Sequence, residues 1–469
     1  MPVSQLKIIR YRELLISADV NHRPGDYFCF MRFYKHFFTN VARLSTPDRV
    51  LVYPKLLLGI TLSIWLIAVL FFGQFPLDFS GNFVGNDFVG FYTGAKLFQD
   101  GNPHDLYDFN KQKQFQDSLV AHLPDHPALE KRSNYTTLFI NPPLSIFLYL
   151  PFSLGSYKTG LLLWWLFGFL CIGLSLKLMQ RHIPGLKNWS GRQLWMMTLV
   201  FFPTLACFMY GQATSIILLI WTLCYMFVIK RQDFMAGFVL SLLFFKPQLA
   251  IGFVLVFIVS LRIKALIGGI VGLSCWLGVS YLIFPVQMLN YQLKAESILE
   301  LLRAQSYPKW GIHSIFGFFN LTVYPYSAKL SDLLTIIFSV LICLFITSVW
   351  WGKKWDPDSE QWHSCLAVTL PLSLLIAIQL FTYDLMLLIF PFFIILGQYQ
   401  LRVKDAYAYL DGGLVLAWTS VAYWGCFLSG HLTMIQLGIL EKLNLPPIGV
   451  QLSVLCIVGW SMTLWRQSK

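Results

Sequence analysis

Long apolar runs separated by short polar breaks dominate the pattern of this chain. Several of them reach the roughly 20 residues that a helix needs to cross about 30 Å of hydrocarbon. The runs are continuous and do not alternate, which excludes an outer-membrane barrel. We therefore expect an all-α polytopic membrane protein with about eleven to thirteen transmembrane helices. The apolar runs lie at about residues 56–74, 138–154, 159–180, 193–210, 213–229, 234–245, 248–261, 265–284, 331–352, 362–381, 384–398, 408–428 and 446–465.

Composition supports the membrane class and excludes others. The 469 residues are 56% hydrophobic and only 12% charged, against about 25% charged residues in a soluble domain. The net charge of +12 comes from short Lys and Arg clusters between apolar runs, where such residues orient helices. We therefore expect the lipid bilayer as a partner and no nucleic acid. The nine cysteines contain no CxxC spacing, so the sequence predicts no disulfide, metal site or cofactor.

The distribution of charge predicts which side of the membrane each segment faces. Residues 1–55 carry nine Lys and Arg against four acids, so we expect a cytoplasmic N-terminal extension at 1–54. The first span then leads outward to a loop at about 75–137, which holds eight acids and five Lys and Arg. All later basic clusters are cytoplasmic if the segment at 138–154 re-enters the membrane, which its two prolines favour. A plain crossing is the alternative.

This orientation places four breaks on the same outer side as the first loop. They are "YGQ" at 210–212, "FKPQ" at 245–248, the loop at about 285–330, and "FTYDL" at 381–385. Polar side chains from distant parts of the chain are therefore predicted to meet at one face.

Asp87 is the main catalytic candidate, because it closely follows the first span. After it, Phe88, Phe91, Tyr92, Ala95 and Phe98 recur at three- and four-residue spacing, which predicts a helix along the membrane interface. An ionised carboxylate is favoured at a helix N-terminus, and a positioned carboxylate is what a general base requires. Tyr92 on this helix is a candidate substrate contact. The alternative for Asp87 is a helix cap or a solvated loop residue.

Lys246 and Asp384 are ionisable residues inside otherwise apolar segments, where such residues are functional candidates. Lys246 interrupts two short apolar runs just before Pro247, and we expect it to hold a phosphate at the membrane surface. Its alternative is a lysine that extends to the interface. Asp384 follows Tyr383 and opens an apolar run. It is predicted to orient a sugar hydroxyl or to position Lys246, with a helix cap as the alternative.

The remaining candidates are weaker. Gln212 is a polar turn residue on the outer side and a candidate substrate contact, as is Tyr383. Arg303, Lys309 and His313 are candidate contacts to phosphate or sugar, with a solvated loop as the alternative. Motifs of other chemistries are absent from the sequence, namely the phosphate-binding P-loop, the HExxH zinc helix and the GxSxG nucleophile elbow.

Four stretches in order resemble glycosyltransferase family 87. They are "NDFVGFYTGAKLFQDGNPHDLYD", "NPPLSIFLYLPFSLG", "GQATSIILLIWTLCYMFVIKRQDFMAGFVLSLLFFKPQLA" and "TYDLMLLIFPFF". The resemblance runs from about residue 55 to 400. It implies an integral-membrane enzyme with the GT-C type of fold, which uses a polyprenyl-phosphate-linked sugar as donor, mannose in the best-known members.

The resemblance also implies roles for single residues. An acidic residue of the first outer loop is the base in such enzymes, which is Asp87 here. Lys246 falls on the Lys-Pro pattern of the family, and Tyr383 and Asp384 fall on its Tyr-Asp-Leu pattern. The chain departs from the family in its polar extension and in "WGIHSIFG", where an Asn-Gln-Ser type of stretch is expected. These departures leave the donor and the acceptor open.

The resulting hypothesis is a catalytic transmembrane module at 55–400, preceded by the extension at 1–54 and followed by further helices at 401–469. We expect it to move a hexose, mannose first, from a polyprenyl-phosphate donor to a glycan or glycolipid acceptor with inversion. The reaction is predicted on the outer face of a bacterial inner membrane, in service of the cell envelope. A transporter or flippase of a lipid-linked saccharide is the alternative, for which repeated halves are expected. An oligosaccharide ligase or polymerase of another fold is a third.

Overall fold

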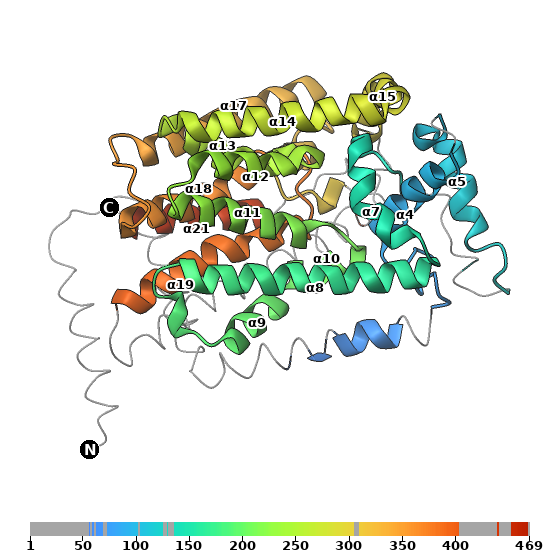
Figure 1. Ribbon diagram of the computed structural model, residues 1–469, viewed down its shortest axis with the longest axis horizontal. Helices are drawn as coiled ribbons and strands as arrows, with labels where there is room; N and C mark the ends of the chain where they lie inside the picture. Colours follow the sequence, from blue (N-terminus) through green and yellow to red (C-terminus); the bar gives the residue numbers. More distant parts are fainter. Residues whose placement is uncertain are drawn as a thin grey trace, which may run out of the picture.

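The computed structural model is an assembly of helices (Figure 1). The structure describes residues 73–101, 104–124, 136–303, 309–402 and 452–467, together with positions 56, 59–60, 62–68, 129 and 439. Within these ranges no strand forms, and extended pairing is limited to isolated bridges. The predicted all-α class is confirmed.

Most of the described helices follow one another closely along the chain. In chain order, the α-helices and the 3-10 helices (η) are α4 (Asn86–Gln99), η1 (Asp105–Tyr107), α5 (Phe109–Ser118), η2 (Pro143–Ser145), α7 (Ile146–Ser153), α8 (Tyr157–His182), η3 (Leu186–Asn188), α9 (Gly191–Val200), α10 (Phe202–Tyr210), α11 (Thr214–Ile229), α12 (Asp233–Leu240), η4 (Ser241–Phe245), η5 (Pro247–Ala250), α13 (Ile251–Val259), α14 (Ile263–Ile283), α15 (Pro285–Arg303), η6 (Lys309–Gly311), α16 (Ile315–Thr322), α17 (Ala328–Trp350), α18 (Glu360–Leu375), η7 (Asp384–Leu388), α19 (Ile389–Arg402) and α21 (Leu452–Gln467).

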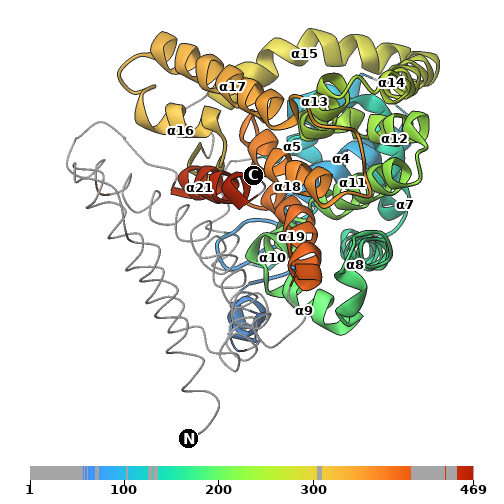
Figure 2. The same ribbon diagram turned by 90° about the vertical axis from the view of Figure 1, so that its left-hand side faces the viewer.

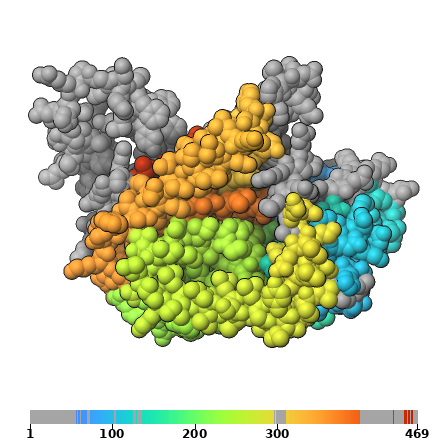
Figure 3. All heavy atoms as spheres, turned by 90° about the horizontal axis from the view of Figure 1, so that it is seen from above, coloured from blue at the N-terminus to red at the C-terminus, as the bar shows by residue number. Residues whose placement is uncertain are grey.

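The long helices lie roughly side by side and form one bundle. Helix α12 packs on α14, α11 packs on α8 and α12, and α18 contacts α13, α17, α19 and α21. Figure 2 looks along this bundle. Helices α4, α5 and α7 gather at one end of it (Figure 1). Figure 3 shows the blue and cyan atoms around α4 and α5 beside yellow α15, where the Lys294 ammonium lies 5.4 Å from the centre of the Phe109 ring.

Among the described residues, three helices are long and apolar enough to span a membrane. They are α8, α14 and α17, and the bent pair α9 and α10 makes a fourth if it counts as one span. The other apolar helices are shorter than 18 residues. The expectation of eleven to thirteen spans also counted short runs, such as those at 234–245 and 248–261, and the structure divides several runs into short helices.

Prolines explain two of these divisions. The run at 193–210 bends by 69° between α9 and α10, where Pro203 lies in the first turn of α10. The other break, between the runs at 234–245 and 248–261, lies at Lys246 as the sequence predicted, and its φ of −141° and ψ of 62° are not helical. The ring of Pro247 disfavours the helical conformation of the residue before it. The Lys-Pro sequence therefore predicts a helix break at Lys246.

The segment after the first outer loop is too short to cross as a helix. Residues 136–142 are not helical, and the helical part, Pro143–Ser153, includes a further proline at 151. Eleven residues of helix span only about 16 Å, roughly half of the hydrocarbon thickness. This geometry favours the re-entrant alternative over a plain crossing.

Helix α4 forms where the apolar spacing predicted a helix, but it is covered by protein. Phe88, Phe91, Tyr92 and Ala95 are all buried, and the helix packs on α7, α5, α8 and α10. The expectation of a helix along the interface needs this correction, because a three- and four-residue spacing reveals an apolar face and not what covers it.

The predicted N-terminal extension at 1–54 and the apolar run at 408–428 lie outside the described residues. Of the first predicted span, the described positions at 56, 59–60 and 62–68 are helical. The division into three domains stays a prediction.

Candidate active site

The start of α4 is attached to the end of α10 through backbone contacts. The Gly85 amide donates a hydrogen bond to the Met209 carbonyl at 3.2 Å. Gly211 follows α10 with a φ of 68°, and a Cβ there would lie 2.6 Å from the Cβ of Phe88. Only glycine fits this left-handed position and this close approach. The contact places Asp87, the second residue of α4, beside Gln212.

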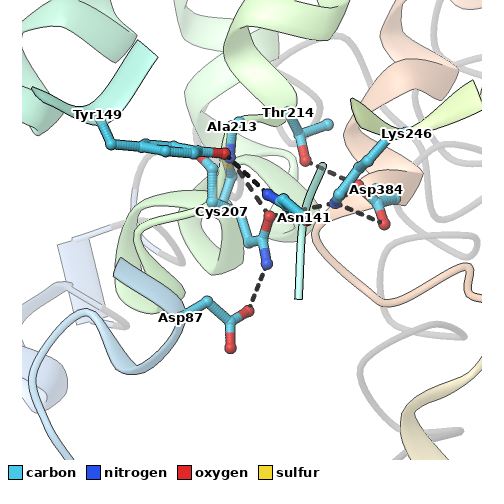
Figure 4. A network of polar contacts seen from close by, with 9 residues as sticks. Asp87, Asn141, Tyr149, Cys207, Ala213, Thr214, Lys246 and Asp384 are labelled. Carbon is cyan, nitrogen blue, oxygen red and sulfur yellow. Dashed lines mark hydrogen bonds and ion pairs between the residues drawn. The ribbon is translucent and has the colours of Figure 1, made fainter. Parts of the chain in front are cut away.

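Gln212 is the centre of a chain of polar contacts (Figure 4). Its Nε2 donates to Oδ2 of Asp87 at 2.7 Å. Its Oε1 accepts from Nζ of Lys246 at 3.1 Å. The amide therefore bridges a carboxylate on α4 and an ammonium at the break between η4 and η5.

Lys246 continues the chain to the start of η7. Its Nζ donates to Oδ1 of Asp384 at 3.0 Å and lies 5.0 Å from the centre of the Tyr383 ring. Asp384 is only 1% exposed, and its Oδ1 also accepts from the Thr214 hydroxyl at 2.9 Å. A buried carboxylate needs such partners. Four predicted site residues, Asp87, Gln212, Lys246 and Asp384, thus form one connected network.

The electrostatic surroundings of Asp87 suit proton transfer. Burial raises the pKa of Asp87 from 3.8 to about 6, although the Gln212 hydrogen bond, the Lys246 charge and a Tyr383 hydrogen bond each act to lower it. The residue as a whole is only partly buried. A carboxylate with a pKa near neutral pH is ionised under physiological conditions and still basic enough to accept a proton.

Comparison with known families decides the class. The sequence model of glycosyltransferase family 87 matches residues 139–377. The chain belongs to glycosyltransferase family 87. No curated protein and no solved structure matches it. Gln212 and Lys246 lie inside the matched stretch, whereas Asp87 precedes it and Asp384 follows it. The network of contacts is what joins them to the family region.

Membership of family 87 and the apolar helices make the protein an integral-membrane glycosyltransferase. Its substrates are a sugar donor and an acceptor. The resemblance to this family is confirmed. The second and third of the four sequence stretches lie within the matched residues, and the first and fourth lie outside them.

Two predicted residues lie outside the network. The Tyr92 hydroxyl donates to the Gly155 carbonyl at 2.8 Å, and its ring meets that of Tyr157 edge-on at 5.3 Å. His313 is fully buried, with Nδ1 2.7 Å from the Ser453 hydroxyl and Nε2 2.8 Å from the Thr382 hydroxyl. His313 thus fixes the segment that precedes Tyr383. The side chains of Arg303, at the end of α15, and Lys309, at the start of η6, lie outside the described part of the structure.

Sequence reasoning missed other polar and aromatic residues at the site. Thr214 reaches Asp384 from the first turn of α11. The Asn141 amide donates to the Tyr149 hydroxyl at 3.2 Å, as Figure 4 shows. Tyr210 is 37% exposed, with its ring 5.6 Å from that of Tyr383. Asn141 was visible as a polar residue before two prolines in an apolar stretch, but Thr214 and Tyr210 carry no comparable signal.

Proposed function

We propose that this protein transfers a hexose from a polyprenyl-phosphate donor to the hydroxyl of a glycan or glycolipid acceptor, with Asp87 as the base. The observation that carries this proposal is the bonded series Asp87, Gln212, Lys246 and Asp384, in which a carboxylate with a pKa of about 6 stands near a lysine. Mannose is the first donor sugar to test.

The proposed reaction is a direct displacement. Asp87 accepts the proton of the acceptor hydroxyl while the hydroxyl oxygen attacks the anomeric carbon. The bond between that carbon and the phosphate oxygen breaks, and the polyprenyl phosphate leaves with the bonding electron pair. Attack opposite to the leaving group inverts the configuration at the anomeric carbon.

Lys246 is suited to hold the leaving phosphate. An ammonium has three N–H donors. Nζ of Lys246 contacts Oε1 of Gln212 at 3.1 Å and both carboxylate oxygens of Asp384, at 3.0 and 3.4 Å. A phosphate oxygen would replace the longest of these contacts, the one to Oδ2 of Asp384. The Lys246 side chain is 13% exposed, which permits contact with a ligand. Charge that develops on the leaving oxygen in the transition state is stabilised by such a positioned cation.

The charge balance of the network calls for further cations when the donor binds. With Asp87 and Asp384 ionised, the two carboxylates exceed the single charge of Lys246 by one. The donor phosphate adds another negative charge. Arg303 and Lys309 are our candidates for this task, because they flank the connection between α15 and η6.

Aromatic side chains complete the proposed sugar site. The ring of Tyr383 lies 5.6 Å from that of Tyr210 and 5.0 Å from Nζ of Lys246. A sugar ring can pack its C–H groups on such a surface, and Tyr383 and Asp384 can orient its hydroxyls. In this scheme His313 acts through Thr382 to fix Tyr383, and Tyr92 supports the position of α4.

The proposed donor explains why the site lies at the end of a helix bundle. A polyprenyl tail stays in the bilayer, so its phosphate must reach the protein at the membrane surface. The basic N-terminal segment supports an extracytoplasmic position of this end, by the positive-inside rule. We propose the inner membrane of a bacterium, with the N-terminus in the cytoplasm.

Purified protein in lipid nanodiscs with radiolabelled polyprenyl-phosphate mannose tests this function. Membrane lipids and glycans of the expression host serve as the acceptor mixture, and both loss of donor and label in the product fraction are measured. We expect transfer by the wild type, none by Asp87→Asn, and transfer by Asp100→Asn, which changes an exposed acid at the end of the same helix. Equal transfer by Asp87→Asn refutes the base. Transfer from GDP-mannose but not from the lipid donor refutes the donor class.

A further inference from the structure

We propose that Gln212 is a positioning residue, which orients the Asp87 carboxylate and transmits the charge of Lys246 to it. The inference rests on the proposed function, because it takes Asp87 as the base. It assigns Gln212 a role within the protein in place of the substrate contact that the sequence predicted.

The two neighbours of Gln212 permit only one orientation of its amide. Lys246 is purely a donor, and an ionised Asp87 is purely an acceptor. With the amide reversed, its NH2 group would face the ammonium and its oxygen would face the carboxylate, so both hydrogen bonds would be lost. The amide therefore presents an N–H to Asp87 because Lys246 occupies its oxygen, at 3.1 Å.

The surrounding chain holds Gln212 in this place. The side chain is 8% exposed. Its backbone N–H donates to the Cys207 carbonyl at 2.9 Å, and its own carbonyl accepts from the Cys207 thiol at 3.4 Å. The Trp164 indole donates to the Gly211 carbonyl at 2.9 Å. A residue fixed at both backbone groups can direct its side chain without further ordering cost.

A neutral amide between cation and base also solves a chemical conflict. A lysine in direct contact would stabilise the ionised carboxylate strongly and make it a poor base. Through the amide, the charge of Lys246 polarises the N–H that Asp87 accepts. Asp87 thus receives an oriented hydrogen bond and keeps enough basicity to take the acceptor proton.

The pH dependence of transfer tests this role, with kcat/KM measured from pH 4.5 to 9. Gln212→Leu removes the hydrogen bond to Asp87 and keeps the approximate side-chain volume. We therefore expect the decrease of kcat/KM toward acid pH to occur about one to two pH units higher than in the wild type. Gln212→Glu can still accept from Lys246 but sets a second negative charge beside Asp87. In that variant, the decrease of kcat/KM toward acid pH should shift to higher pH by at least as much.

Gln99→Leu is the matched control, because Gln99 lies on the same helix as Asp87, is exposed, and donates to the Ser153 hydroxyl at 2.8 Å. The kcat/KM of this variant should fall toward acid pH at the same pH as that of the wild type. If Gln212→Leu does not fold, Gln212→Glu carries the test, since the two side chains have nearly the same shape. The proposal is overturned if a folded Gln212 variant loses kcat/KM toward acid pH at the same pH as the wild type, or at a lower pH.

Infrared titration separates this inference from the proposed function. The carboxyl signal of Asp87 is obtained by subtracting the spectrum of Asp87→Asn, in nanodiscs without substrates. A higher midpoint in Gln212→Leu than in the wild type supports the positioning role even where no transfer is detected. An equal midpoint overturns it even where transfer depends on Asp87. A purely packing role for Gln212 would lower transfer at every pH and leave the midpoint unchanged.

Discussion

Ion pairs of opposite character lie near the two ends of α11. Near its first residue, Thr214, which contacts the Asp384 carboxylate, Lys246 pairs with Asp384, and their side chains are only 13% and 1% exposed. After its last residue, Arg231 pairs with Asp356 at 3.2 Å and with Asp358 at 2.6 Å, with side chains 47%, 52% and 73% exposed. We call them the site end and the turn end. About 24 Å of helix separates them.

The difference in exposure distinguishes ion pairs at the surface from charged residues of a candidate functional site. Exposed pairs such as those of Arg231 contribute little free energy, because water already solvates both partners. A buried pair carries a desolvation cost that apolar residues of the same volume would avoid. The site end keeps its charges in spite of this cost. Shifted pKa values and buried charge are typical of functional sites, and Asp87 lies in that surrounding.

The largest expected effect is on the base. Asp87→Asn should lower transfer by about 10²- to 10⁴-fold, the usual contribution of a general base, because the amide cannot accept the acceptor proton. Initial rates with labelled donor measure this loss. Size-exclusion profiles must match the wild type, and Asp100→Asn serves as the control. A loss of less than about fivefold would place the base elsewhere.

Breaking the buried pair should affect both stability and transfer. Lys246→Met leaves Asp384 charged, buried and without its ammonium, which costs roughly 3 kcal/mol of folding free energy. Thermal unfolding in detergent should show a clearly lower midpoint, and the KM for the donor should rise. Arg231→Met is the matched variant at the turn end.

The double variant Lys246→Met with Asp384→Leu sharpens this prediction. Removal of both charges should recover much of the lost stability, while the donor KM stays high. If transfer recovers together with stability, Lys246 is a structural residue and does not bind phosphate.

Acid pH should have a smaller effect of known sign. The role proposed for Asp87 requires the deprotonated carboxylate. Since burial raises the pKa of Asp87 to about 6, its ionised fraction falls as the pH decreases through 6, and about one tenth remains at pH 5. We expect kcat/KM to fall about tenfold between pH 7 and pH 5. A profile that stays flat down to pH 5 would contradict the raised pKa.

The smallest effect is expected at the turn end. Arg231→Ala removes two exposed contacts and should change the free energy of unfolding by less than about 1 kcal/mol. Donor KM and kcat should stay at wild-type values. A loss of transfer there would show that the turn end is coupled to the site, and that the contrast between the two ends is wrong.

The sequence predicted the breaks of this fold better than its packing. The Lys-Pro pair and the glycine before Gln212 are local signals, because proline and glycine act on their own backbone. They gave the positions of Gln212 and Lys246. The partner of Lys246 is a long-range fact, since Asp384 lies 138 residues away. The sequence offered that pairing only as one role for Asp384 and gave no contact from Lys246 to Gln212.

Other site features could not be predicted because they depend on what covers a side chain. Tyr92 and Phe88 share an apolar face that suits lipid or protein equally well. In the sequence, His313 cannot be told from a solvated loop residue. In the structure its two ring nitrogens contact the hydroxyls of Ser453 and Thr382. Thr214 is an ordinary helix residue in the sequence and gains meaning only from the carboxylate that it contacts.

The separation of the site residues along the chain has a consequence for biogenesis. Gln212 is synthesised 125 residues after Asp87, and Asp384 is synthesised 170 residues after Thr214. Until η7 emerges from the ribosome, Lys246 has no buried counter-ion and the end of the bundle is incomplete. The candidate site is therefore complete only after the Tyr-Asp turn at the start of η7 has been synthesised.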